Sequence, residues 1–145
     1  MNDAWYLIDS NVLSQLTLEQ RASAFVRERC RIPSEVIHEA SGFPDIGVLR
    51  KLEYPVTTDV LECVREVMKT VAPGDFKLVD LYHNKGGADP ILVATALVEL
   101  RKSKETLFPH DWVVVSDDLA VRAKATEVGV SILCAEDFAK LLSEQ

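Results

Sequence analysis

The stretch WYLIDSNVL, residues 5–13, decides the fold. Its first four residues form an apolar run with the length of a buried strand, and the run stops on a carboxylate, Asp9, followed at once by small polar residues. Open α/β sheets bind their ligands beyond the carboxyl ends of their strands. Asp9 is therefore predicted to stand at the ligand-binding edge of a parallel sheet.

A second buried strand is predicted at residues 112–116, where the sequence WVVVS is rich in β-branched side chains. Shorter extended segments are expected at 31–33, 54–56 and 130–133. Helical patterns separate these segments, which favours parallel strands joined by right-handed crossovers. The predicted fold class is α/β, a three-layer α/β/α sandwich with a central parallel sheet, Rossmann-like in its general architecture.

The helices are expected at 12–29 (in two pieces that break near residues 16 and 17), 35–40, 57–71, 78–83, 89–100, 120–126 and 135–142. Thr17 and Gln20 have the spacing of a capping box, and Ser34 is the expected N-cap of the helix that follows it. The first two turns of the segment 91–100 are apolar nearly all round, so this helix is expected to be central and buried. Residues 45–56 remain ambiguous, with a turn of helix and a short extended piece as the expectation.

The composition is that of one globular domain spanning 1–145, with 48% hydrophobic and 27% charged residues. No apolar run approaches the ~18 residues of a membrane span. The amino terminus carries no basic cluster, and the three cysteines are widely spaced, which favours reduced thiols in a cytoplasmic protein over a disulfide framework or a zinc site. The net charge of −7 argues against extensive electrostatic wrapping of nucleic acid. It does not exclude a nuclease, because clustered acids are neutralised when metal binds.

Acidic residues follow both of the predicted buried strands. Asp9 ends the first; Asp117 and Asp118 both follow the second, and Asp118, which opens the next helix, is the preferred candidate, with Asp117 as the fallback. Each of these residues has an alternative interpretation as an ordinary helix cap or solvated loop residue. Together they are more informative, because both strand ends are expected at the same edge of one sheet.

Two further acids lie near the ends of expected helices. Glu39 lies at the margin of the apolar stripe of the helix at 35–40, whereas Glu35 and His38 point further out, so Glu39 is the better inward-facing ligand. Asp89 precedes Pro90, which is ordinary helix-starting chemistry. Because the helix it opens is almost wholly apolar, its carboxylate is expected close to the core, where it needs a cation or the helix dipole to stay charged.

The predicted site is therefore a metal centre built from carboxylates. Like charges that converge repel one another, so Asp9, Glu39, Asp89 and Asp118 are expected to require a cation at neutral pH. Oxygen ligands without a Cys or His cluster favour Mg²⁺ or Mn²⁺ over zinc. Asn11 is expected to hold Asp9 in place, and the Ser116 hydroxyl to donate to a neighbouring carboxylate or to water on the metal.

The sequence resembles the PIN-domain family, specifically the VapC-like ribonuclease toxins of toxin–antitoxin pairs. The matching blocks are Leu7-Ile8-Asp9-Ser10-Asn11-Val12-Leu13, Ile32-Pro33-x-x-Val36-x-x-Glu39, Gly87-Ala88-Asp89 with Ala94 and Ala96 after it, and Val114-Val115-Ser116-x-Asp118. They occur in the order of the family and cover most of the chain. Ser10 and Ser116 stand where threonine is commoner, and Pro90 directly after Asp89 is unusual.

The resemblance implies metal-dependent hydrolysis of single-stranded RNA, a homodimer, and a small antitoxin partner that inserts near the site. It implies that Asp9, Glu39, Asp89 and Asp118 form the acidic quartet, with Asn11 and Ser116 as helpers. Lys85, Arg122 and Lys124 are weaker candidates for contacts with RNA phosphates, against the alternative of solvated cations.

Two other functions compete with the nuclease. The first is a non-catalytic PIN-like module that binds proteins; the complete acidic set argues against it. The second is a phosphatase or phosphotransferase with Asp9 as nucleophile. That chemistry usually needs a second acid two residues on, a position that Asn11 occupies.

Overall fold

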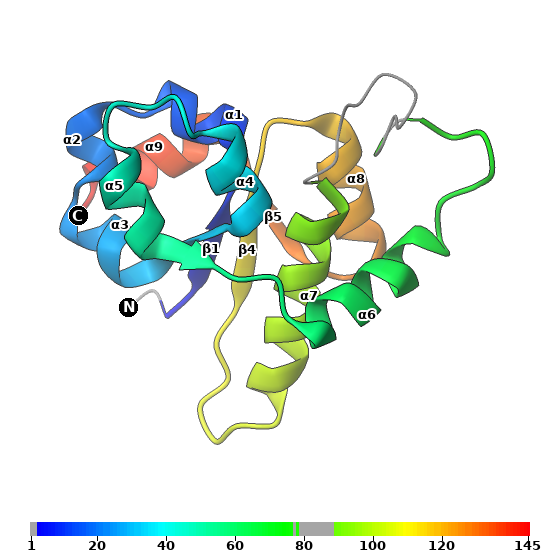
Figure 1. The fold of residues 1–145 in the computed structure, drawn as a ribbon. Coiled ribbons are helices and arrows are strands. Elements are labelled where there is room, and N and C mark those ends of the chain that lie inside the picture. The colour runs from blue at the N-terminus through cyan, green and yellow to red at the C-terminus, as the bar shows by residue number, and fades with distance from the viewer. Residues whose placement is uncertain (1–2, 77, 79–88) are drawn as a thin grey trace.

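A computed structural model of the chain describes residues 3–76, 78 and 89–145. Within these ranges five strands form one sheet in the order β3-β2-β1-β4-β5, and every neighbouring pair is parallel (Figure 1). The strands are β1 (Trp5–Ile8), β2 (Cys30–Pro33), β3 (Glu53–Tyr54), β4 (Trp112–Val115) and β5 (Ser131–Leu133). The three four-residue strands β2, β1 and β4 thus occupy the centre, and the two shorter strands lie at the edges.

Helices cover both faces of this sheet (Figure 1). One layer contains α1 (Ser10–Gln15), α2 (Leu18–Arg21), α3 (Ala24–Arg29), α4 (Ser34–Glu39), α5 (Ile46–Leu49) with the 3-10 turn η1 (Arg50–Leu52), and α9 (Ala135–Ser143). The other contains α6 (Thr58–Met68), α7 (Asp89–Lys104) and α8 (Leu119–Glu127). The predicted three-layer α/β/α sandwich with a central parallel sheet is confirmed.

Alternation along the strands builds the two cores. Tyr6 and Ile8 of β1 enter the core beneath the first layer, whereas Leu7 between them enters the core beneath the second. In β4, Val113 and Val115 face the first core, and Val114 faces the second. Successive side chains of a strand point to opposite faces, so strands buried on both sides must be apolar throughout. This explains why the sequence of both strands is a continuous apolar run.

The register of the two central strands fixes where their polar ends meet. Ile8 pairs with Val115, and the backbone N–H of Asp9 donates to the carbonyl of Val115 at 3.0 Å. Asp9 and Ser116, the next residues along each strand, are therefore neighbours at the carboxyl edge of the sheet. A parallel arrangement places both strand ends at this edge.

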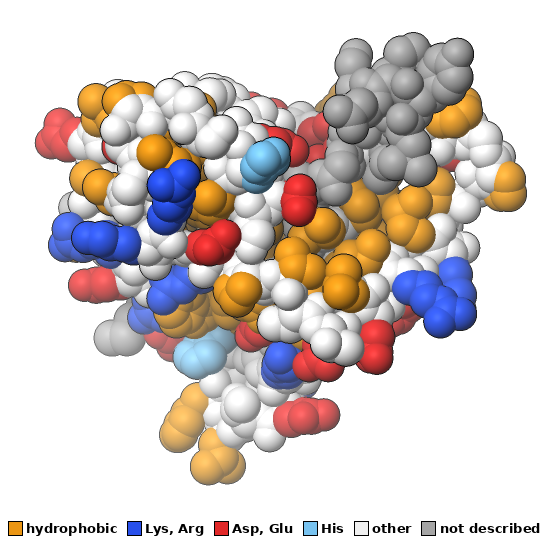
Figure 2. Space-filling view, viewed as in Figure 1, with side chains coloured by type: hydrophobic (Ala, Val, Ile, Leu, Met, Phe, Trp, Pro, Cys, Tyr) orange, Lys and Arg blue, Asp and Glu red, His pale blue; other side chains and the backbone are white. Residues whose placement is uncertain are grey.

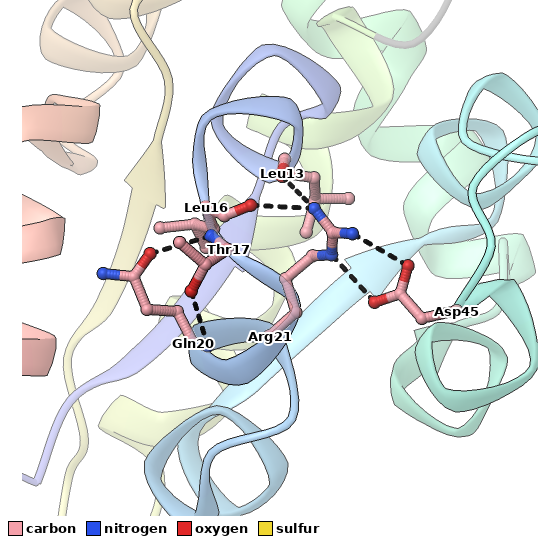
Figure 3. Close-up of polar contacts among 6 residues, drawn as sticks. All are labelled: Leu13, Leu16, Thr17, Gln20, Arg21 and Asp45. Carbon is pink, nitrogen blue, oxygen red and sulfur yellow. Dashed lines mark hydrogen bonds and ion pairs between the residues drawn. The ribbon is translucent and has the colours of Figure 1, made fainter.

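The short helices after β1 are fastened by one buried arginine (Figure 3). Arg21 donates through Nε and Nη2 to both carboxylate oxygens of Asp45, at 2.8 and 2.9 Å, and through Nη1 to the carbonyls of Leu13 and Leu16, both at 2.9 Å. It thereby adds a donor to the Leu16 carbonyl at the C-cap of α1 and a second donor to the Leu13 carbonyl, which also accepts from the N–H of Leu16 at 3.3 Å. The start of α1, beside Asp9, is held in place by this anchor at its other end.

The segment predicted as two helical pieces at 12–29 forms three short helices. The break at Thr17 is confirmed: its hydroxyl accepts from the N–H of Gln20 at 3.1 Å, and the Gln20 side chain accepts from the N–H of Thr17 at 2.9 Å. A second break lies at Ser23, whose hydroxyl caps α3 by accepting from Val26 N–H at 3.4 Å. Serine and threonine compete with the backbone in this way, which ends one helix and starts another.

Other boundaries shift by a few residues. Pro33, not Ser34, occupies the N-cap position of α4, and the Ser34 hydroxyl instead donates to the carbonyl of Tyr54 at 3.3 Å. The helix that opens at Asp89 continues to Lys104, beyond the expected residue 100. The helix expected at 78–83 lies outside the described residues except for the buried Leu78. No helix in the described part of the chain is long and apolar enough to cross a membrane.

Candidate metal centre

Asp9 is the most enclosed acid of the candidate site, with only 4% of its surface exposed. It is the N-cap of α1, and its Oδ1 accepts from the backbone N–H of Ser10 at 2.7 Å. Its Oδ2 accepts from the hydroxyl of Ser116 at 2.7 Å. Burial raises the pKa of this carboxyl, the charge of Asp118 raises it further, and the two hydrogen bonds oppose the rise.

Ser116 links two of the four predicted ligands. Its side chain is completely buried, donates its proton to Asp9, and accepts from the backbone N–H of Asp118 at 3.1 Å. One hydroxyl thus fixes the rotamer of Asp9 and the turn that carries Asp118. The sequence-based expectation that Ser116 donates to a neighbouring carboxylate agrees with this geometry.

Asp118 stands at the start of α8 as its N-cap. Its Oδ1 accepts from the backbone N–H groups of Ala120 and Val121, at 2.8 and 3.3 Å. Among the described residues, Oδ2 has no hydrogen-bond donor. Capping and metal binding are therefore compatible, because the two oxygens can serve different partners.

Asp89 is the first residue of α7 and is followed by the buried Pro90. The pKa of its carboxyl is raised to about 7, first by burial and then by the negative charges of Asp9, Asp118 and Glu39. Three charges from three other parts of the chain act on this one group. The fold therefore brings the four predicted acids into one electrostatic neighbourhood.

Glu39 reaches this neighbourhood through a serine that sequence reasoning missed. Glu39 is exposed at the end of α4, and its Oε2 accepts from the hydroxyl of Ser10 at 2.8 Å. Ser10 lies directly after Asp9 and contacts both acids, through its backbone N–H and its hydroxyl. The sequence contained one clue, a hydroxyl residue next to the strand-ending acid, but the contact depends on how α4 packs beside α1.

Asp117 and Asn11 lie beside the acid cluster and brace the turn after β4. Asp117 accepts from the N–H of Ala135 at 2.8 Å and from the side chain of Gln15 at 2.9 Å, and these bonds, in that order, lower the pKa of its carboxyl. Asn11 Oδ1 accepts from the N–H of Asp117 at 3.5 Å. Asp117 thus connects α1, the β4–α8 turn and the start of α9. Asn11 therefore contacts the β4–α8 turn, whereas the sequence had suggested that it contacts Asp9.

The candidate phosphate-binding cations differ in placement. Lys124 donates to the Thr70 hydroxyl at 2.8 Å and forms an ion pair with Glu127 at 2.6 Å, so it is already engaged. Arg122 lies near enough to Asp117 to help lower the pKa of that carboxyl, and its buried Nε has no hydrogen-bond partner among the residues that the structure describes. Lys85 lies outside the described residues.

The charge and chemistry of the cluster fit a hard divalent cation. None of the described lysines and arginines forms an ion pair with the four acids. In the described part of the chain, no three acidic, histidine or cysteine side chains lie close enough together to hold a metal ion. The donors are nevertheless all carboxylates, their charges are uncompensated, and Mg²⁺ and Mn²⁺ prefer such oxygens.

Comparisons with known proteins add a structural likeness. No protein-family model and no curated protein matches the sequence. The fold is similar to that in the crystal structure of PAE2754 from Pyrobaculum aerophilum, with a TM-score of 0.57 and 19% sequence identity over 98% of this chain and 99% of that one. At this identity the likeness concerns the fold alone, and it extends over the full length of both chains.

Proposed function

We propose that this chain is a metal-dependent endoribonuclease of the PIN-domain type that hydrolyses phosphodiester bonds of single-stranded RNA with Mg²⁺ or Mn²⁺. The observation that carries the proposal is the hydrogen-bonded link between the acids: Ser116 contacts Asp9 and Asp118, and Ser10 contacts Asp9 and Glu39. The raised pKa of Asp89, caused first by burial and then by the charges of these three acids, is consistent with it. Acids that repel one another at neutral pH without a basic partner are typical of sites that bind cations. The ordered sequence blocks that resemble the family supply the second support.

In this proposal each acid has a distinct task. Asp9 and Asp118 are the firmest ligands, because Ser116 fixes both of them. Asp89 and Glu39 complete the coordination of the cation or orient the attacking water. Divalent cations in such sites lower the pKa of water and stabilise charge on the attacking and leaving oxygens.

The hydroxyl groups hold these acids ready. Ser116 directs Asp9 Oδ2, and Ser10 directs Glu39 Oε2. Outer hydrogen bonds of this kind orient ligands, and their loss typically weakens metal affinity by about 10- to 100-fold. In the proposal these bonds fix side chains supplied by the end of β1, by α4 and by the β4–α8 turn, and binding of the cation would draw the acids closer together.

The biological setting that we propose follows from the resemblance. The chain would act in the cytoplasm as the toxin of a toxin–antitoxin pair, as a homodimer, and with a small antitoxin protein as partner. A small basic or DNA-binding protein encoded directly upstream would support the toxin assignment. An isolated reading frame would count against it and leave the nuclease proposal standing.

The decisive experiment compares Glu39→Gln with Glu35→Gln. Both residues are exposed glutamates of α4, and Glu39 alone of the two contacts Ser10. We expect Glu39→Gln to lower Mn²⁺-dependent cleavage of a single-stranded RNA by about 100-fold, the lower range for a positioned acid or base. Glu35→Gln should leave it unchanged. Equal activity of the two variants would contradict the assigned role of Glu39.

Calorimetric titration with Mn²⁺ distinguishes the nuclease from the alternative function, a non-catalytic PIN-like module that binds proteins. We expect Mn²⁺ titrated into the wild-type chain to bind with release of protons, since carboxyl groups must lose theirs to become ligands. Asp118→Ala should lose this binding. Absence of metal uptake by the wild type would leave the protein-binding module as the better interpretation.

A further inference from the structure

A loop at the opposite end of the sheet from the acids is held rigidly at its base. Residues 105–111 connect α7 to β4, and the buried Ser103 accepts from the backbone N–H of His110 through its hydroxyl. The Ser103 carbonyl accepts from the hydroxyl of Thr106 at 2.7 Å, and the carbonyl of Asp111 accepts from the N–H of Trp5 at 2.9 Å. These bonds fix both ends of the loop to the body of the domain.

The tip of this loop carries two large apolar side chains in solvent. Leu107 is 92% exposed and Phe108 is 79% exposed. The loop projects away from the body between the yellow-green end of α7 and β4 (Figure 1), and hydrophobic side chains form the end of the projection in the space-filling view (Figure 2). Exposed apolar side chains that gather in one place indicate an interaction site, whereas those scattered singly over a surface are ordinary.

A hollow adjoins the tip on the same face. Its volume is about 510 Å³, and Trp5, Trp112, His110 and Lys102 contribute to its wall together with the side chains at the tip. Trp5 stacks on Trp112 with ring centroids 5.6 Å apart, and the guanidinium of Arg31 lies 5.0 Å from the Trp5 ring centroid. The wall is therefore a packed aromatic surface with fixed geometry, suited to receive an apolar side chain.

We propose that a second copy of this chain docks here, with the Leu107–Phe108 tip of each protomer entering the tryptophan-lined hollow of the other. A projecting apolar tip and an apolar hollow on one face are the two halves of an isologous contact, which a two-fold axis satisfies at the same time. The inference names the face of the proposed homodimer, and it stands whether or not the chain cleaves RNA.

Charge favours a second copy over a nucleic acid or an anionic membrane. Of the cations at this end of α7, Arg101 pairs with Glu66 at 2.7 Å and Lys102 pairs with Asp59 at 3.4 Å and Glu99 at 3.9 Å. The third, Lys104, is followed directly by an acid, Glu105. The face is therefore close to neutral in a chain whose formal net charge is −7. Two equally acidic copies can share a neutral contact, whereas a polyanion needs unpaired cations.

The geometry also predicts that this dimer does not involve the acid cluster. Trp5 and Trp112 begin β1 and β4, and Asp9 and Ser116 follow the far ends of the same strands. A dimer formed at the amino edge keeps both acid clusters at the outer ends of the assembly. Disrupting it should change oligomeric state and leave Mn²⁺ binding unchanged.

The test uses sedimentation velocity together with tryptophan fluorescence. Trp5 and Trp112 are the only tryptophans, and both line the hollow, so their emission reports its occupancy. For the wild-type chain between about 1 and 100 µM, the range of a modest interface, we expect a monomer–dimer transition with a parallel change in emission. Phe108→Ser should weaken association at least about tenfold and abolish the emission change, as for a truncated interface anchor.

The matched control is Leu119→Ser on α8, since Leu119 is 76% exposed and lies away from this face. It should dimerise like the wild type, and circular dichroism should show both variants folded. Raising NaCl from about 0.05 to about 0.5 M should strengthen the dimer, because it screens the repulsion of two acidic copies. A wild type that stays monomeric, a Phe108→Ser variant that dimerises normally, or a monomer that floats with neutral phosphatidylcholine vesicles would each overturn the proposal.

Discussion

The hydroxyl of Ser116 donates to Asp9 across 107 positions of sequence, at 2.7 Å, inside the carboxyl edge of the sheet. The same oxygen accepts from the backbone N–H of Asp118 at 3.1 Å. A single buried hydroxyl therefore couples the strand that opens the domain to the turn that carries the last acid of the cluster. This link joins two of the four acids of the candidate site.

We expect Ser116→Ala to reduce both stability and metal affinity. The buried Oδ2 of Asp9 and the N–H of Asp118 would each lose a partner, which costs about 1–3 kcal/mol of unfolding free energy. Mn²⁺ affinity should fall by about 10- to 100-fold, as expected when a ligand-orienting bond is lost. Urea unfolding and calorimetry measure the two effects. Ser116→Thr, which keeps the hydroxyl, is the control, and an equally severe loss of affinity in that variant would contradict the role of the hydrogen bond.

Asp9→Asn should remove activity without unfolding the protein. The amide keeps an oxygen that can accept from Ser10 or Ser116, but it lacks the negative charge that the proposed cation requires. We expect RNA cleavage with Mn²⁺ to fall by about 100-fold or more, with a melting temperature close to that of the wild type. Asp117→Asn should instead lower the melting temperature and leave RNA cleavage close to that of the wild type, because Asp117 accepts hydrogen bonds from Ala135 and Gln15. Loss of activity in both variants at unchanged stability would argue against this division of roles.

Asp89→Asn should stabilise the protein in the absence of metal. The change removes a partly buried charge that faces those of Asp9, Asp118 and Glu39. A gain of about 1 kcal/mol, roughly 3 °C in melting temperature, is expected from relieving such strain at a functional site. The variant should also lose the stabilisation that Mn²⁺ gives the wild type. Thermal melts with and without Mn²⁺ test this, with the exposed Asp137→Asn as control; a lower melting temperature for Asp89→Asn in chelator would contradict it.

The Arg21–Asp45 pair should make stability depend on acid pH. The hydrogen bonds from Arg21 are the main cause of the lowered pKa of Asp45. Because the folded-state pKa is depressed, the pair stabilises the fold above the ordinary unfolded value of about 3.9, and this contribution is lost as the pH falls through the lower folded value.

Asp45→Asn should therefore lower the unfolding free energy by about 3 kcal/mol at neutral pH, since it leaves a buried guanidinium without its counter-charge. The difference from the wild type should shrink as the pH falls below about 4, as measured by urea unfolding over that range. Glu66→Gln is the control, because Glu66 and Arg101 form an exposed pair with little effect on stability. A pH-independent difference would show that Asp45 acts through packing alone.

Much of the fold could be read from local patterns. The apolar runs of β1 and β4 predicted central strands because strands buried on both faces tolerate few polar residues. Thr17 and Gln20 predicted a helix start because their side chains satisfy the free N–H groups of the first turn. Local patterns were less informative where a segment contains more than one residue that could start or end a helix. Ser23 starts a further helix inside the segment 12–29, and Ser34 bonds to Tyr54 from a distant strand where the sequence suggested a cap.

The sequence by itself determined that acids follow two buried strands, Asp9 after the first and Asp117 with Asp118 after the second, because each apolar run gives way to polar residues. Only the tertiary structure decided which neighbours those acids meet. Ser10 donates to Glu39, and Asp117 accepts from the N–H of Ala135 at the start of α9. Leu107 and Phe108 are exposed to solvent beside the two tryptophans. The physical reason is range: strand and helix patterns are set by neighbours a few residues away, whereas a hydrogen bond or a solvent-exposed tip depends on how distant segments pack.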